Sequence, residues 1–310
     1  MKREDKMNKS KIQGSYDTNR QCLGKIYPLS TPFTIILDTS EVCNFRCNYC
    51  FRSTDTIDAW GDYAIKKNIM NWDVFKQAVE QIKEFPEDIK QISLSNHGEP
   101  LCNRRLPEMV RYIKEQNISS RISIHTNASL LDKEYALELA TSGIDKIVIS
   151  LQGLNEKIYK EVCAVEVNFD DFYQNLKILY DNKKENTIIN IKIMDIAVGN
   201  QEKEFYELFS KISDYVFVEK MVPIWKNTGN NDDKPEMMMN KYGEGFPYQE
   251  CCPLVFNTLV VTPEGDVYPC TQVLSKERLG NITEGTLVKF WNSKHREELL
   301  RGQLLLQKNE

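Results

Sequence analysis

Short runs of β-branched residues alternate with helical patterns between residues 33 and 222, and this alternation constrains the fold more than any other feature. Strands that are joined through helices must pair in parallel, because parallel strands need crossover connections. The predicted strands are residues 33–39, 91–95, 121–126, 146–151, 188–196 and 215–221. Six units predict an α/β fold, a partial (β/α)6 TIM-like barrel, because a closed barrel of this type needs eight.

The predicted helices lie between these strands and repeat apolar residues at intervals of three and four, the period of one helix face. Asn71 is placed to cap the first of them, and Gly143 to end the third. The predicted helices cover residues 72–85, 106–116, 133–141, 169–180 and 202–212. These stripes predict helices that pack on the sheet.

The pattern changes after residue 222. Residues 226–248 are polar and lack periodicity, which predicts a linker or lid. Two strands, 256–262 and 266–269, flank Pro263-Glu264-Gly265 and predict a β-hairpin with a positive φ at Gly265. A final helix is predicted over about residues 284–305. The predicted organisation is an N-terminal tail (1–30), the partial barrel (31–225), the linker or lid (226–248), and a small domain of β-hairpin plus helix (249–310).

Composition excludes several functional classes. The chain has 310 residues, of which 41% are hydrophobic and 27% charged, as in an ordinary globular protein. Its formal net charge of -5 argues against a nucleic-acid partner. No segment approaches the roughly 18 apolar residues of a membrane span, and no signal peptide precedes the barrel. Nine cysteines without a secretion signal predict reduced thiols for metal or redox use, and hence a cytoplasmic protein.

Three cysteines, Cys43, Cys47 and Cys50, form a CxxxCxxC loop directly after the first predicted strand. A closed structural zinc site needs four ligands, whereas three thiolates leave one corner of a metal centre open for chemistry. The alternatives at this point are a zinc knuckle and buried thiols. The loop predicts a metal centre with an open coordination position.

Polar residues also follow the next three predicted strands. They are His97-Gly98-Glu99-Pro100, His125-Thr126-Asn127 and Ser150-Leu151-Gln152. The carboxyl ends of parallel strands carry the ligand chemistry of α/β proteins, so these groups are candidates for one site. The alternative is structural, because the first segment suits a simple turn, and Asn127 and Ser150 suit helix caps.

In these features the chain resembles the radical S-adenosylmethionine (SAM) superfamily, whose cysteine loop has an aromatic residue before its last cysteine. Tyr49 fills that position. The family also has Gly-Gly-Glu-Pro after the second strand, and this chain has His97-Gly98-Glu99-Pro100. His97 departs from that pattern, while Gly-Glu-Pro is intact. The resemblance covers about residues 33–222.

The resemblance implies that Cys43, Cys47 and Cys50 hold a 4Fe-4S cluster whose remaining iron binds SAM, which is cleaved to a 5'-deoxyadenosyl radical. It further implies roles for the residues around the bound SAM. Gly98, Glu99 and Pro100 would line its ammonium group, Tyr49 would lie under the adenine, and Asn127 and Ser150 would contact the ribose and carboxylate. An external electron donor such as flavodoxin or ferredoxin is also implied.

A second resemblance lies at the C-terminus, where Cys252, Gly265 and Cys270 match the opening half of a SPASM domain or its shorter Twitch form. This implies at most one auxiliary iron–sulfur cluster, held by Cys252 and Cys270, with Cys251 as the candidate third ligand. No further cysteines follow the last helix, so either the domain is abbreviated or the chain stops before the rest of it. The alternative is a small hairpin domain with buried thiols.

Two substrate classes remain for such an enzyme. The first hypothesis is oxidation of an alcohol carbon in a sugar, aminocyclitol or similar metabolite, with the auxiliary cluster accepting an electron and His97 or Asp195 as candidate base. The alternative is a maturase of a ribosomally made peptide, against which residues 1–32 are too few for a leader-peptide domain. A small molecule is favoured over a peptide. An electron-carrying or zinc-stabilised module does not explain Gly98-Glu99-Pro100.

Overall fold

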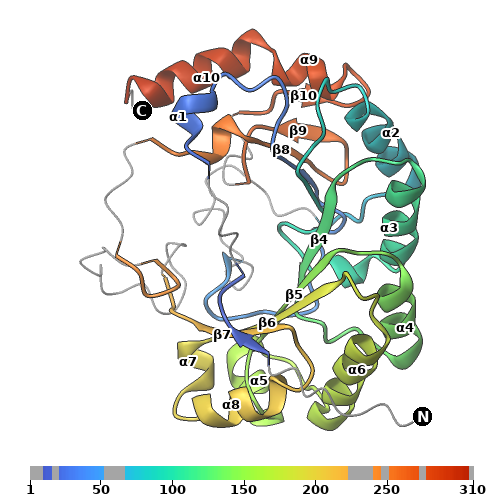
Figure 1. Cartoon of the computed structure of the whole chain (residues 1–310), viewed down its shortest axis with the longest axis vertical. Coiled ribbons are helices and arrows are strands. Elements are labelled where there is room, and N and C mark those ends of the chain that lie inside the picture. The colour runs from blue at the N-terminus through green and yellow to red at the C-terminus, as the bar shows by residue number, and fades with distance from the viewer. Residues whose placement is uncertain are drawn as a thin grey trace. The chain divides into compact units, whose positions relative to one another are not determined.

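A computed structural model of the chain describes residues 10–15, 21–51, 67–222, 240–245, 251–271 and 277–306. They divide into two compact units, each assembled from separate segments of the chain (Figure 1). The first unit comprises Met1–Asp17, Phe45–Ser53 and Thr126–Phe246. The second comprises Thr18–Asn44, Thr54–His125 and Pro247–Glu310. The cysteine loop therefore contributes to both units.

All six predicted strands occur, several of them shorter than predicted. They are β2 (Thr34–Leu37), β3 (Gln91–Ser93), β4 (Arg121–Thr126), β5 (Lys146–Leu151), β6 (Ile188–Met194) and β7 (Tyr215–Glu219). The strand predicted over residues 188–196 ends early because Asp195 begins a short helix, α7 (Asp195–Val198). Its side chain accepts a hydrogen bond from the Ile196 amide at 2.9 Å, a contact that competes with strand pairing.

The first unit contains parallel strands in the order β1-β7-β6-β5. β1 (Lys11–Ile12) pairs with β7 and lies inside the segment predicted as an N-terminal tail. The accompanying helices are α4 (Lys133–Thr141), α5 (Glu156–Cys163), α6 (Phe169–Asn182), α7 and α8 (Glu202–Phe209). Helix α4 packs beside α6 (Figure 1). Alternate strand residues Ile147, Ile149, Ile189 and Ile191 are fully buried, which places them in the core of this unit.

The second unit contains parallel strands in the order β4-β3-β2-β8, followed by antiparallel β9 and β10. Its helices are α1 (Leu23–Ile26), α2 (Trp72–Ile82), α3 (Leu106–Glu115), α9 (Leu287–Trp291) and α10 (Lys294–Leu304), with short 3₁₀ turns at Pro100–Cys102 and Leu254–Phe256. Asn71 caps α2 as predicted, accepting from the amides of Asp73 and Val74. Figure 1 shows α2 and α3 side by side.

The predicted hairpin is confirmed by β8 (Thr258–Val261) and β9 (Asp266–Tyr268), with Gly265 at φ +85°. β8 also pairs in parallel with β2, which extends the sheet of the second unit. β10 (Gly280–Asn281) pairs with β9. The prediction of a single final helix was wrong, because the helical backbone is interrupted between α9, which ends at Trp291, and α10, which begins at Lys294. Ser293 caps α10 by accepting from the Arg296 amide at 3.2 Å.

Helix α5 was not predicted, because its eight residues contribute only Tyr159 and Cys163 to the core. Asn155 caps it by accepting from the Ile158 amide at 3.0 Å. Most of the predicted linker or lid, residues 226–239 and 246–248, lies outside the described residues. Among the residues that the structure describes, no helix combines the length and apolar character needed to cross a bilayer.

Candidate functional site

The loop after β2 is fastened to the loop after β3 by close backbone contact. A Cβ atom on Gly98 would lie 2.2 Å from the Ser40 carbonyl oxygen and 2.5 Å from that of Val42. The Glu99 amide donates to the Val42 carbonyl oxygen at 2.8 Å. A side chain at position 98 would therefore push apart the two loops, one of which leads into Cys43. Glycine is required at this position by close approach, and not by backbone conformation.

Glu99 is 3% exposed, and its carboxylate caps the 3₁₀ turn Pro100–Cys102 by accepting from the Leu101 amide at 3.0 Å. Pro100 occupies the first position of this turn, where its missing N–H costs nothing. These contacts fix the direction of the carboxylate. The predicted contact of Gly98, Glu99 and Pro100 with the SAM ammonium stays a prediction.

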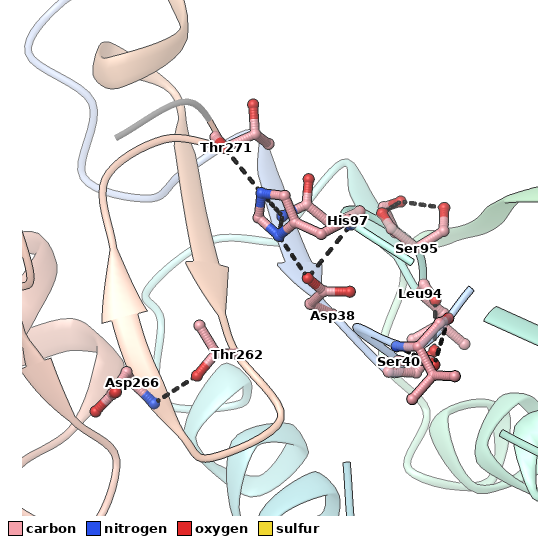
Figure 2. Close-up of polar contacts among 12 residues, drawn as sticks. Asp38, Ser40, Leu94, Ser95, His97, Thr262, Asp266 and Thr271 are labelled. Carbon is pink, nitrogen blue, oxygen red and sulfur yellow. Dashed lines mark hydrogen bonds and ion pairs between the residues drawn. The ribbon is translucent and has the colours of Figure 1, made fainter. Parts of the chain in front are cut away.

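His97 connects β2 to the segment that follows β9 (Figure 2). Its Nδ1 lies 2.7 Å from Asp38 Oδ2, and its Nε2 lies 3.1 Å from the Thr271 carbonyl oxygen. Both side chains of the pair are buried, and Asp38 Oδ1 has no hydrogen-bond partner within the described part of the chain. Because both ring nitrogens are engaged, a role for His97 as base would require one contact to open. That role stays a prediction.

We expect His97→Ala to lower the free energy of unfolding by about 1–3 kcal/mol, because it removes the side chain that lies 2.7 Å from the buried Asp38 Oδ2 and leaves that oxygen without this hydrogen-bond partner. The matched control is His295→Ala. His295 pairs with Glu277 at 3.0 Å with half of its side chain exposed, and an exposed pair contributes only about 0–1 kcal/mol. Denaturant unfolding of both variants measures the difference, and equal losses would contradict a buried, energetically coupled pair.

Thr271 directly follows Cys270, one of the predicted auxiliary-cluster ligands. Cys270 is buried in an apolar cluster with Phe256 and Leu300, and Cys251 packs against the same cluster. Cys252 is exposed, and its amide donates to Gln303 Oε1 at 3.4 Å. Burial, and then the neighbouring Cys252, raise the pKa of the Cys251 thiol. The structure thus groups Cys251 with Cys270, and the ligand roles of all three cysteines stay predictions.

Cys47 lies against the C-terminal end of α5 in the first unit. Its Sγ is 3.5 Å from Cys163 Sγ, a contact that no spacing or motif in the sequence predicts. The Cys163 contact and burial both raise the pKa of Cys47. Cys50 turns back on Cys47 through a 2.9 Å backbone hydrogen bond. Tyr49 is half-buried with its hydroxyl oxygen enclosed, and desolvation, followed by the charge of Cys47, raises its pKa. Its place under the adenine stays a prediction.

The remaining predicted residues lie in the first unit. Asn127 accepts from the amide and hydroxyl of Ser129 at 2.9 and 2.8 Å, a local turn, whereas the helix that follows, α4, is capped by Asp132 and not by Asn127 as its alternative role required. Asp195 Oδ1 accepts from the amides of Ile196 and Met221, both at 2.9 Å, and its Oδ2 lies 3.5 Å from Lys220 Nζ. Ser150 is half-buried on β5. A catalytic role for Asp195 and cofactor contacts of Asn127 and Ser150 stay predictions.

Sequence reasoning missed three polar residues on β6 and β7. Asn190 and Lys192 alternate along β6 with the buried Ile189, Ile191 and Ile193, so they share one face of the strand. Lys192 pairs in register with Ser150 on β5, and its Nζ lies 2.7 Å from Glu219 Oε2 on β7. For Asn190 and Lys192 the signal was available, since they are two polar residues at alternate positions of a β-branched run.

The cysteines have the donor chemistry of an iron–sulfur site, since thiolates are the usual ligands of such clusters. Across the described residues, no three Cys, His, Asp or Glu side chains are gathered into a metal-binding group. The assignment of Cys43, Cys47 and Cys50 therefore rests on their spacing and on the loop contacts around them. The backbone at Gly98 lies so close to Ser40 and Val42 that no side chain fits there. Such close approach is expected where two loops must place their residues around one bound group.

Comparison with known proteins identifies two domains. Residues 37–209, more than half of the chain, match the Radical SAM superfamily, and residues 251–310 match the SPASM iron–sulfur cluster-binding domain. A probable GTP 3',8-cyclase of Methanococcus maripaludis (strain C5) is 28% identical over 188 residues, 61% of this chain and 58% of that protein. The chain thus spans less than two thirds of this relative's length.

Solved structures show the fold. BtrN in complex with AdoMet and 2-DOIA has a TM-score of 0.54 at 20% identity, covering 87% of this chain and 86% of that one. SuiB of Streptococcus suis bound to precursor peptide SuiA has a TM-score of 0.57 at 17% identity, covering 90% and 69%. These likenesses, with the parallel strands of both units, confirm the predicted α/β fold of the partial-barrel type.

Both of the matched domain families bind cofactors. A Radical SAM domain binds a 4Fe-4S cluster and SAM, and a SPASM domain binds an auxiliary iron–sulfur cluster. The three-thiol loop suits the first cluster, and the cysteines of residues 251–270 lie inside the second match. The chain belongs to the radical SAM superfamily and carries a short SPASM domain.

Proposed function

We propose that this radical SAM enzyme is an oxidoreductase that dehydrogenates an alcohol carbon of a sugar, aminocyclitol or similar polar metabolite. When bound, the 4Fe-4S cluster and SAM supply a 5'-deoxyadenosyl radical for hydrogen abstraction, and the auxiliary cluster supplies an acceptor for the second electron. The protein must then hold a hydroxylated substrate and accept its hydroxyl proton. His97 and Asp195 are the proposed bases.

The observation that carries this proposal is the polar face of β6. Strands of a parallel sheet that are buried on both faces are normally apolar throughout. Here Asn190 is 1% exposed, and its Oδ1 has no hydrogen-bond partner among the described residues. A buried amide oxygen without a partner costs about 1–3 kcal/mol, which a bound hydroxyl group would recover. Lys192 and Ser150 stand in register beside each other near Asn190.

Glu219 is held between two lysines. Lys192 Nζ lies 2.7 Å from its Oε2, and Lys241 Nζ lies 3.0 Å from its Oε1. Burial alone would raise the pKa of Glu219, but the two lysines bring it below its usual value. Burial lowers the pKa of Lys192, although Glu219 opposes this. A carboxylate placed between two lysine amino groups is a cluster of strong donors and acceptors suited to a small polar substrate.

Substrate-dependent cleavage of SAM tests this function. The chain is reconstituted anaerobically, reduced with dithionite, and assayed for 5'-deoxyadenosine with panels of polyols, aminocyclitols and short peptides. We expect a polyol or aminocyclitol to accelerate 5'-deoxyadenosine formation and to lose two hydrogens, detected as a carbonyl product by mass spectrometry. Acceleration by peptides alone, or by GTP alone, would refute the proposal.

We expect Lys192→Met to slow formation of the oxidised product about ten- to a hundredfold while retaining iron content and SAM binding. A hydrogen bond to a charged group contributes about 1.5–3 kcal/mol, which corresponds to this range. The matched control is Lys177→Met, which removes an exposed lysine that pairs with Asp181 on α6. The rate of product formation is measured for both variants, and a melting curve of each shows whether it is folded. Unchanged turnover in Lys192→Met would show that the polar face of β6 does not bind the substrate.

Modification of a ribosomally made peptide is the second candidate function. The likeness to SuiB in complex with its precursor peptide favours it, since a chain of this fold accommodates a peptide there. The panel experiment separates the two candidates, because a modified peptide and a carbonyl product have different masses. A peptide that is both consumed and required for rapid 5'-deoxyadenosine formation would establish the second candidate.

A further inference from the structure

We propose that the Cys163 thiol donates a hydrogen bond to the Cys47 sulfur when Cys47 ligates the 4Fe-4S cluster, and that this bond raises the reduction potential of the cluster. Cys163 is then a positioning residue of the cluster loop and not a ligand. The inference rests on the family assignment and is independent of the substrate proposed above.

The contact is one of several that join the cysteine loop to the C-terminal end of α5. The last carbonyl groups of a helix lack partners within the helix. Here the Cys163 carbonyl oxygen accepts from the Arg46 amide at 3.0 Å, and the Val162 carbonyl oxygen accepts from the Asn48 amide at 2.9 Å. The two amides flank Cys47 on either side. The loop backbone therefore caps the helix and places the Cys47 sulfur 3.5 Å from that of Cys163.

Buried side chains enclose the helix side of the junction, while Cys47 itself is half-buried. Cys163 and Tyr159 are both 0% exposed, and Phe45 packs edge-to-face on Tyr159 with the ring centroids 6.0 Å apart. Ala164 ends the helix with a left-handed backbone, φ 56°, and its amide bonds back to the Lys160 carbonyl oxygen. A hydrogen bond from a fully buried donor such as Cys163 is electrostatically stronger than one in water.

The direction of the hydrogen bond follows from the chemistry of a ligand. A cysteine that binds iron is a thiolate and has no proton to donate. The proton between the two sulfur atoms must then belong to Cys163. Hydrogen bonds to the sulfur ligands are one of the factors that set the potential of iron–sulfur clusters. A donor stabilises the reduced state more than the oxidised state, because the reduced cluster is more negative, so its potential rises.

Substitutions at position 163 test the assignment. Cys163→Val fills a similar volume without a donor, and Cys163→Ser keeps a donor. The cluster that binds SAM is identified as the one whose EPR signal changes on SAM addition, and its midpoint potential is measured in each reconstituted protein. We expect a lower potential in Cys163→Val, a potential near that of the unchanged chain in Cys163→Ser, and equal iron and sulfide content. An unchanged potential in Cys163→Val, or loss of iron in Cys163→Ser, would overturn the proposal.

A second measurement tests the contact without the cluster, and it remains decisive if Cys163→Val does not fold. The iron-free full-length chain is oxidised with copper–phenanthroline, and its disulfides are mapped by mass spectrometry. A disulfide needs the sulfur atoms about 2.05 Å apart, which a small rotation of two side chains already 3.5 Å apart provides. We expect a Cys47–Cys163 link to predominate. Oxidation that links Cys47 only to other cysteines would contradict the contact.

Discussion

Replacement of Cys43, Cys47 and Cys50 by alanine is expected to remove about four irons per chain and to abolish 5'-deoxyadenosine formation. The three thiolates are the ligands that hold the SAM-binding cluster in the proposed site, and no radical forms without it. The irons of an auxiliary cluster should survive, because its predicted ligands lie in the separate match of residues 251–310. Iron and sulfide counting after anaerobic reconstitution, together with the dithionite-driven assay, measures both losses.

The matched control for this triple variant is Cys22→Ala. Cys22 is exposed and lies outside both cysteine groups. Its replacement should change neither the iron content nor the rate of 5'-deoxyadenosine formation. A triple variant that keeps its full iron content would show that other residues hold the cluster, and an unchanged chain that takes up zinc but no iron would refute the cofactor assignment.

Gly98→Ala is expected to slow 5'-deoxyadenosine formation about a hundredfold. The new Cβ would lie 2.2 Å and 2.5 Å from two backbone carbonyl oxygens, which flexible side chains cannot relieve. Either the loop leading to Cys43 or the loop carrying Glu99 must move, and a displacement of about 1 Å near a reacting centre can cost a hundredfold in rate. Overpacking should also lower the free energy of unfolding by about 1–3 kcal/mol.

Gly302→Ala is the control, because a Cβ at position 302 in α10 meets no atom within 4 Å. That variant should be as active as the unchanged chain and slightly more stable, since alanine favours helix by up to about 1 kcal/mol over glycine. SAM-binding titration, the 5'-deoxyadenosine assay and denaturant unfolding compare the two variants. Equal activity in both would mean that the approach of the two loops does not matter for SAM chemistry.

The strands and most helices could be predicted because their signals are local. Asn71 lies next to the amides that it caps, and Gly265 adopts the positive φ that its turn requires. Helix α5 escaped prediction because its short apolar stripe consists of Tyr159 and Cys163. The break between α9 and α10 was missed because Ser293, a polar residue within a continuous helical pattern, gives a weak signal until its capping contact is seen.

The candidate site divides in a similar way. Cys43, Cys47, Cys50 and the Gly98-Glu99-Pro100 segment are contiguous motifs, so their spacing alone pointed to a metal and SAM site. His97 was a candidate base in the sequence, but its partners Asp38 and Thr271 lie 59 and 174 residues away. No periodicity relates residues at such separations. Their contact depends on how β2, β3 and the end of β9 are packed in the second unit.

By itself, the sequence determined that this chain is an α/β radical SAM protein with a second cysteine-bearing domain, because near-neighbour spacing encodes both strand–helix alternation and cluster motifs. Only the tertiary structure brought Cys163 to Cys47, 116 residues apart, and joined Lys192 and Lys241 to Glu219. Hydrogen bonds and ion pairs act over a few ångströms, whatever the separation along the chain. Which distant groups come within that range is therefore decided by packing and strand register.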